Sequence, residues 1–176
     1  MGAPAHRSGQ GSEARALLRL RLRPGLYLRR GGGRLGRLPA ALDDLARTGL
    51  TVGVAGALVD LLLPLQWNFS APLVLETVDG EPVLDLEEWE HVVEFPLQLP
   101  TGRLLLEGSG GSGQLEIGVP PGAYRARWSG HGFPPAGDYV PGESSQDSYR
   151  LQLWAAQADE PQRELKRWPG YDLLSG

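Results

Sequence analysis

The chain has 176 residues, contains no cysteine and carries a formal net charge of -4. The absence of cysteine excludes a disulfide scaffold, a thiolate nucleophile and a thiolate metal site. It fits a reducing compartment, and we expect a cytoplasmic protein. The 25 Gly and 15 Pro favour turns and short strands over a helical bundle.

Charge is distributed unevenly along the chain. Residues 1–40 contain nine Arg and one Glu, a formal charge of +8, so the remainder carries -12. We expect residues 1–13 to be a disordered basic N-terminal tail, because they contain little that a core could bury. Residues 14–176 are predicted to form a single β-sandwich domain with a C-terminal tail packed on it. The apolar run at 50–65 is interrupted by Asp60 and Pro64, so no contact with a membrane is predicted.

Leucine alternates with arginine from Leu18 to Arg23, and Pro24-Gly25 supplies a turn before Leu26. The pattern predicts a β-hairpin whose outer face is lined by guanidinium groups. Such a face could bind nucleic-acid phosphates. However, Tyr27 is the one aromatic residue nearby, and single-strand binders need several on which bases can stack. We therefore favour an edge strand that its charges protect from aggregation.

One helix is predicted, at residues 38–49. Leu42, Leu45 and Ala46 share an apolar stripe, and Gly49 lies at the expected C-cap position. The run at 50–65 then favours a buried central strand with a tight bend, and a second buried strand is predicted at 71–78.

The stretch 115–156 predicts three strands, the first two joined by a Pro-Pro-Gly turn. In the middle strand Tyr124 and Trp128 fall on one face, while Arg125 and Arg127 fall on the other. The last strand repeats this alternation. We therefore expect an antiparallel sheet with one buried face and one wet face.

Further strand patterns occur at 90–99 and 103–107, and Trp168 and Tyr171 are predicted to fold back over an open end of the core. The predicted fold class is mainly β, an antiparallel β-sandwich with one or two short helices. The loop at 108–113 matches G-x-G-x-x-G, but a strand follows it instead of the helix that a pyrophosphate requires. No cofactor is predicted.

Seven acidic residues and no Lys or Arg occur between Asp79 and Glu94. We interpret this segment as an acidic hairpin whose negative potential steers a basic protein partner. The alternative is a solvated surface, or one neutralised by arginines of the same chain. Trp89 is the expected anchor of the contact. The predicted partner-binding residues are Asp85, Glu87, Glu88, Trp89, Glu90 and Glu94.

The residue patterns give less support to a metal site, a hydrolase site or a carbohydrate-binding site. His91 and Glu94 fall on opposite faces of a strand, so no metal site is predicted. Ser129 and His131 lack the G-x-S-x-G elbow of a hydrolase, and no catalytic residue is predicted. Trp154 falls on a polar face, where it could be an exposed contact for a carbohydrate, whereas Trp128 is assigned to the core.

The order of the elements resembles the competence protein J family. The similar parts are the helix and apolar strand at 38–65, followed by VVEFPLQLPTGRLLLEG, LEIGVPPGAYRARW and DSYRLQLW. The Arg-rich segment, the loop 130–146 and the tail after Ala156 have no counterpart. Members of the family include inhibitors of a competence-associated DNA-entry nuclease. The resemblance therefore implies a small, soluble bacterial protein that binds another protein without catalysis, and it transfers no functional residue.

The predicted function is a non-catalytic protein-binding module, inhibitor-like or immunity-like, that uses its acidic hairpin against a basic partner such as a nuclease. The alternatives left open are a nucleic-acid-binding or carbohydrate-binding β-sandwich and an uncharacterised hydrolase. A homo-oligomer is also left open, in which the basic arm meets the acidic hairpin of the next copy.

Overall fold

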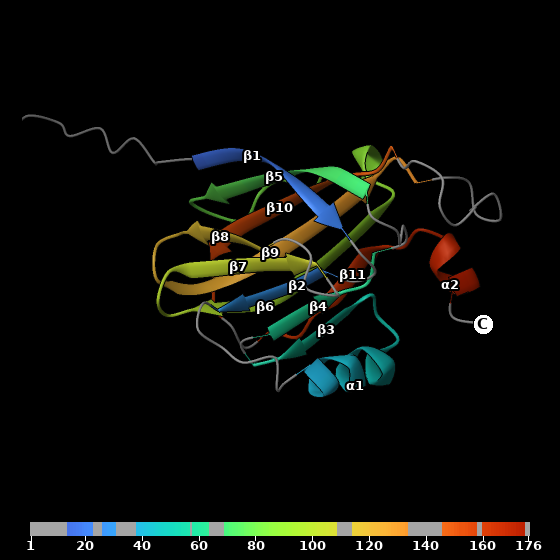
Figure 1. Cartoon of the computed structure of the whole chain (residues 1–176), viewed down its shortest axis with the longest axis horizontal. Helices are drawn as coiled ribbons and strands as arrows, with labels where there is room; N and C mark the ends of the chain where they lie inside the picture. Colours follow the sequence, from blue (N-terminus) through green and yellow to red (C-terminus); the bar gives the residue numbers. More distant parts are fainter. Residues whose placement is uncertain are drawn as a thin grey trace, which may run out of the picture.

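The computed structural model describes residues 14–22, 26–30, 38–56, 58–63, 69–108, 114–133, 146–157 and 160–174. Within them the strands form two sheets accompanied by two short α-helices (Figure 1). The mainly β fold class with few helices is confirmed. The predicted tail at 1–13 and the glycine-rich loop at 109–113 lie outside the described residues, and a single domain over 14–176 stays a prediction.

The first sheet has six strands. In spatial order they are β1 (Ala14–Leu22), β5 (Phe69–Val78), β10 (Ser148–Ala155), β9 (Gly122–His131), β6 (His91–Leu99) and β11 (Arg163–Lys166). All neighbours are antiparallel except β5 and β10, which pair in parallel. The predicted antiparallel arrangement therefore holds for every neighbouring pair of this sheet except one. The direction of β10 is set by its pairing with β9, and this makes it run alongside β5.

The second sheet has five strands. In spatial order they are β3 (Val52–Ala55), β4 (Leu58–Leu61), β2 (Leu26–Arg30), β7 (Arg103–Gly108) and β8 (Gln114–Gly118). The run at 50–65 thus forms the hairpin of β3 and β4 in place of one bent strand. Helix α1 (Leu38–Thr48) packs on these two strands. Gly49, with φ of 67°, ends α1 as predicted, and its amide donates to the carbonyl of Leu45.

Both sheets contribute to one hydrophobic core. Leu73, Phe95 and Leu151 come from the first sheet, and Leu61 and Leu106 come from the second. These side chains alternate with residues that point away from the core, as the period of a strand requires. The first sheet therefore has an inner face in this core and an outer face directed away from the second sheet.

Two pairs of consecutive strands that the sequence predicts as neighbours lie in different sheets. Strand β1 pairs with β5, whereas β2 lies between β4 and β7 in the other sheet. Likewise β8 and β9 belong to different sheets, so the Pro-Pro-Gly corner carries the chain from one sheet to the other. In both cases each strand finds its partner elsewhere in the chain. As predicted, β1 is an edge strand, and the arginine-lined face stays a prediction.

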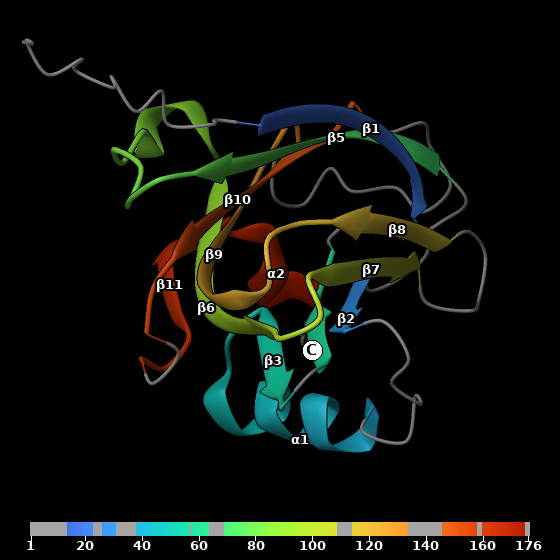
Figure 2. The same cartoon turned by 90° about the vertical axis from the view of Figure 1, so that its left-hand side faces the viewer.

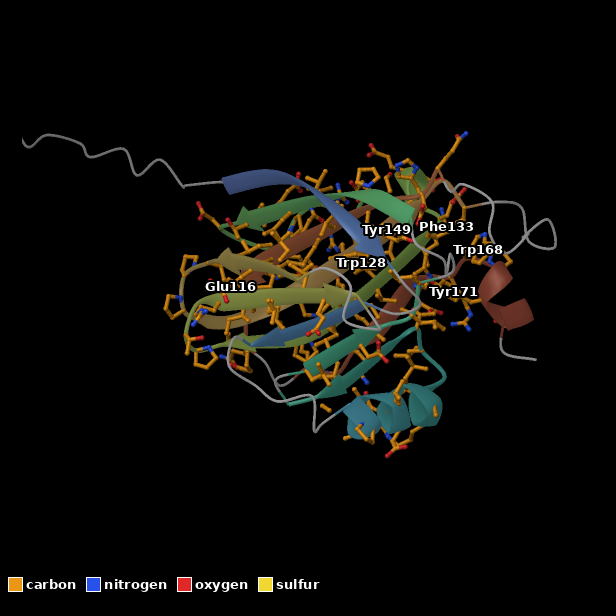
Figure 3. The ribbon with its side chains drawn as sticks, in the orientation of Figure 1. Glu116, Trp128, Phe133, Tyr149, Trp168 and Tyr171 are labelled. Carbon is orange, nitrogen blue, oxygen red and sulfur yellow. The ribbon has the colours of Figure 1, made fainter. Side chains whose placement is uncertain are left out.

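Aromatic side chains close one end of the core, next to helix α2 (Gly170–Leu174) (Figure 3). Trp128 stacks on Tyr149 with ring centroids 4.9 Å apart, and Phe133 connects this pair to Trp168. Tyr171 packs edge-on against Trp168 and donates its hydroxyl to the carbonyl of Leu62. The predicted packing of Trp168 and Tyr171 over the core is confirmed.

Substitution Gly170→Ala should loosen this closure. The added methyl group would lie 2.0 Å from the buried indole of Trp168, which has no room to move. We expect the free energy of unfolding to fall by about 1–3 kcal/mol, as for other overpacked cores. Urea denaturation followed by near-ultraviolet circular dichroism would measure it. The control is Gly118→Ala, where the new methyl group meets no atom within 4 Å; equal losses in the two variants would contradict the packing argument.

Candidate functional site

The outer face of the first sheet is covered, although the sequence predicted it to be wet. Arg125 and Arg127, both on β9, are only 3% and 1% exposed. Trp154 on β10 is 5% exposed, so its predicted role as an exposed contact is also wrong. The guanidinium of Arg127 lies over its ring, 5.2 Å from the centroid. Alternation had separated the two faces correctly, but it could not reveal what packs on the second one.

The covering element is the connection from β5 to β6. These strands are separated in the sheet by β10 and β9, so residues 79–90 form a crossover and not the predicted hairpin (Figure 2). Nη1 of Arg127 donates to the carbonyls of Pro82 and Val83, at 3.0 and 3.3 Å. Nζ of Lys166 donates to the carbonyl of Leu86 at 2.9 Å. We call residues 79–90 the acidic crossover.

Beneath the acidic crossover a row of polar side chains runs across five adjacent strands. The register places in this row Arg163, Glu94, Arg127, Gln152 and Glu76. Opposite charges directly across an antiparallel pair attract each other. At the other end of the row, Gln152 donates to Glu76 at 2.9 Å.

Glu94 is 0% exposed, and three arginines surround its carboxylate. Nε of Arg127 lies 2.8 Å from Oε1, and Nη2 of Arg163 lies 2.8 Å from Oε2. Nε of Arg125 is 3.4 Å from Oε2. Burial by itself opposes ionisation, but the hydrogen bonds and charges of Arg127 and Arg163 prevail and lower the pKa of Glu94. Glu94 is therefore an internal anion, and its carboxylate is not available at the surface.

Three other residues predicted to bind a partner make contacts within the chain. Asp85 lies 2.7 Å from Nη2 of Arg150, whose hydrogen bond lowers the pKa of this carboxyl group. The guanidinium of Arg150 also stacks on Trp89, 4.5 Å from the ring centroid. Glu90 accepts a hydrogen bond from the amide of Phe133 at 2.7 Å. These residues hold the acidic crossover in place.

The remaining predicted residues, Glu87 and Glu88, are exposed in a 3-10 turn at Leu86–Glu88. Two apolar neighbours that the prediction omitted are also exposed, Val83 by 87% and Leu84 by 51%. The sequence shows that these two apolar residues are adjacent, but it does not show that both are exposed. The crossover therefore presents two large apolar side chains beside two carboxylates.

Ser129 and His131 are not arranged as a hydrolase site requires. Ser129 is fully buried on the outer face, whereas His131 is exposed and pairs through Nε2 with Oγ of Ser148 at 2.6 Å. No hydrogen bond joins Ser129 to His131. The contact with Ser148, which lies on the neighbouring strand, could not be predicted from the sequence.

A second histidine hydrogen bond lies within the core. The amide of Trp168 donates to Nδ1 of His91, so Nε2 carries the proton and donates to Oγ1 of Thr51 at 2.7 Å. Because His91 donates, it cannot take a proton from Thr51. Among the residues that the structure describes there is no group of three metal-ligating side chains, and none of their helices is long and apolar enough to cross a membrane.

Comparison with known proteins shows relationship at the level of the fold. No protein-family model matches the chain, and no curated protein sequence matches it. The solved structure titled "Crocagin biosynthetic gene J" has a TM-score of 0.57 and 16% identity, covering 83% of this chain and 99% of its own. ComJ from Bacillus subtilis, whose title calls it an inhibitor of the DNA degrading activity of NucA, has a TM-score of 0.58 and 12% identity. That match covers 84% of this chain and 100% of ComJ. The remote resemblance to the competence protein J family is confirmed.

Substitution Glu94→Gln should be strongly destabilising, because it leaves three guanidinium groups around a neutral amide. We expect the free energy of unfolding at pH 7 to fall by about 3 kcal/mol, as when one partner of a buried ion pair is removed. A carboxyl group whose pKa is lowered by folding stabilises the protein above its unfolded pKa, and this stabilisation is lost as the pH falls through its folded pKa. Acidification from pH 6 to pH 3 should therefore cost the wild type more stability than the variant. Urea titrations at each pH would show this. The control Glu116→Gln alters an exposed ion pair with Arg103 and should change stability little.

His91 should make the free energy of unfolding depend on pH in a higher pH range than Glu94 does. Burial, aided by the charge of Arg167, lowers the pKa of His91 to about 3. Burial also raises the pKa of Asp60 to about 6, which acts in the opposite direction. Below about pH 6.5 the unfolded chain binds a proton at His91 that the folded chain excludes, so His91 contributes a fall in the free energy of unfolding of about 1.4 kcal/mol per pH unit. His91→Gln should remove this slope between pH 6 and 5, whereas His131→Gln should retain it. An unchanged slope in His91→Gln would contradict the assignment.

Proposed function

We propose that the protein is a non-catalytic, cytoplasmic binding module of the inhibitor or immunity type. Its acidic crossover docks on a basic surface of another protein, such as the nucleic-acid cleft of a nuclease. The observation that carries the proposal is the way in which the crossover is held. Arg127 and Lys166 bind its backbone carbonyls and leave the carboxylates of Glu87 and Glu88 directed to solvent.

This arrangement favours binding because the segment is ordered before it meets a partner. Binding usually requires loop and side-chain ordering, and a loop already fixed in place avoids that cost. Here the backbone is held by Arg127 and Lys166, and Asp85 is held by Arg150. Arg127, Lys166 and Arg150 thus position the crossover, and the exposed carboxylates of Glu87 and Glu88 have no internal partner among the described contacts.

The exposed surface combines the two chemistries of a protein contact. Carboxylates accelerate encounter with a basic partner and select for it, while desolvated apolar groups slow dissociation. Val83 and Leu84 are the apolar side chains that a partner would cover. Trp89 supports the surface from beneath through its stacking with Arg150. Glu87 and Glu88 would occupy positions that nucleic-acid phosphates take in a nuclease cleft.

The fold relationship is consistent with this role. ComJ is described as an inhibitor of the DNA degrading activity of NucA, and its whole length aligns with this chain. At 12% identity the likeness concerns the fold, so a nuclease partner for this chain rests on the proposal alone.

The proposal is tested by affinity capture from a lysate of the source organism with two matched baits. Glu87→Gln with Glu88→Gln removes two outer charges, and Asp43→Asn with Glu116→Gln removes two exposed charges elsewhere. We expect the wild type and the second variant to retain the same basic protein, and the first variant to lose it by about tenfold or more. Equal retention by both variants would refute the role of the crossover.

The captured protein then decides the kind of inhibition. Added protein should suppress its DNA degradation, and the affinity should weaken as salt is raised, because exposed charges are screened over about 8 Å at physiological ionic strength. Val83→Ala with Leu84→Ala should weaken binding mainly through faster dissociation, with little change in the salt dependence. An affinity that is the same at low and high salt would contradict the electrostatic mechanism.

A further inference from the structure

Helix α1 presents an apolar stripe to solvent on the side that faces away from the second sheet. Ala41 lies on the inner side and is 0% exposed, and a methyl group added at Gly53 of β3 would lie 2.0 Å from its carbonyl oxygen. Leu42 is 46% exposed, and Pro39 and Ala46 are also exposed. Because Pro39, Leu42 and Ala46 are spaced by three and four positions, they lie on one side of the helix. The apolar surface of α1 is therefore only partly buried within the chain.

Two opposite charges accompany this stripe on one flank. Asp43 and Arg47 are both exposed and lie one turn apart, each directly after a residue of the stripe. Arg47 pairs with Asp44 at 2.5 Å, yet its side chain is still 71% exposed. Asp43 belongs to none of the ion pairs among the described residues. The flank thus carries a carboxylate followed by a guanidinium, and both are accessible to another molecule.

This order of charges is complementary to itself. When two identical helices pack in opposite directions about a two-fold axis, the same flank of each helix lies on the same side of the contact. Asp43 of each copy then lies opposite Arg47 of the other, so symmetry forms two ion pairs. Leu42 of each copy lies beside Ala46 of the other, whose small side chain lets the helix axes approach to about 8–10 Å. A partner segment that is only basic or only acidic would repel one of the two charges.

We propose that α1 is the contact surface of a weak homodimer, in which the two α1 helices pack antiparallel about a two-fold axis. The 11 residues of α1 span about 16 Å. One helix from each copy buries less than the roughly 1,200 Å² at which stable interfaces begin, so the dimer belongs to the class of transient contacts. We expect a dissociation constant on the order of 100 μM.

A dimer of this kind leaves the acidic crossover free. Helix α1 packs on the second sheet, whereas the crossover lies on the outer face of the first sheet, on the opposite side of the core (Figures 1 and 2). Dimerisation through α1 therefore does not depend on the proposed function. If both are correct, each dimer presents two crossovers, and a partner with two sites is bound more tightly by avidity.

The first test compares two exposed leucines by sedimentation equilibrium of the full chain. From about 20 μM to 1 mM, the mean mass of the wild type should rise from 19.0 kDa toward twice that value. Leu42→Gln should weaken the association about tenfold or more, through loss of an apolar contact. The matched control is Leu84→Gln, because Leu84 is 51% exposed but lies on the acidic crossover. This variant should associate like the wild type.

The second test exchanges charges between copies. Asp43→Lys alone sets cations against cations, and Arg47→Glu alone sets anions against anions, so each variant should associate about fivefold more weakly or worse. In an equimolar mixture every cation again faces an anion, and a heterodimer should form with about the affinity of the wild type. Rescue by mixing does not arise from misfolding. The control mixture is Arg103→Glu with Glu116→Lys, which reverses an exposed ion pair of β7 and β8 and should leave association unchanged.

Three results would each overturn the proposal. The first is a mean mass that stays at the monomer value up to about 1 mM, which would leave α1 to a different partner or to none. The second is equal weakening in Leu42→Gln and Leu84→Gln. The third is a mixture of Asp43→Lys and Arg47→Glu that associates no more than its two components do separately.

Discussion

The carboxylate of Glu94 is a negative charge buried among guanidinium groups, and the outer face of the first sheet is arranged around it. A buried carboxylate is tolerated when nearby charges and hydrogen bonds satisfy it. Arg127 and Arg163 do so from the strands on either side of β6, and each forms a 2.8 Å contact. The short strand β11 is thereby tied to the sheet edge through side chains as well as backbone pairing. The acidic crossover lies over Arg127 in this cluster, whereas Arg163 stays 51% exposed.

Arg127 also holds a segment at the surface of the protein. An arginine that binds Glu94 through Nε still has other donors, and Arg127 uses Nη1 to hold the carbonyls of Pro82 and Val83. The fork of the guanidinium group makes this double use geometrically natural, which a lysine could not reproduce. As a result only some of the carboxylates of the crossover are neutralised by arginines of the same chain. A pocket that adjoins this cluster is polar, with Arg125 and Arg163 beside the carboxylates of Glu81 and Glu160 among its lining residues.

Features that depend on near neighbours in the chain could be predicted. Gly49 ends α1 because a C-cap requires a left-handed residue just there, and the alternation in β9 separated Trp128 from Arg127 correctly. Trp168 and Tyr171 packed on the core as expected, since large aromatic groups in a short tail have much to gain from burial. The errors concern partners. Alternation predicts that Arg125, Arg127 and Trp154 face solvent, because it identifies the two faces of a strand but not a distant segment that crosses over one of them.

Hydrophobic period, turn residues and charge are local properties, and the mainly β class, the positions of most strands, the first helix and the acidity of residues 79–94 follow from them. Which strands become neighbours, and with that the roles of the charged residues, depends on contacts between distant parts of the chain and became visible in the folded structure. Glu94 looked like one acid of a surface run, yet the register sets it opposite Arg127 and Arg163. Glu87 and Glu88 belong to the same run and stay outside. The physical reason is that the role of a charged side chain depends on its burial and on the charges beside it. In the folded protein these neighbours come from segments that are distant in the chain.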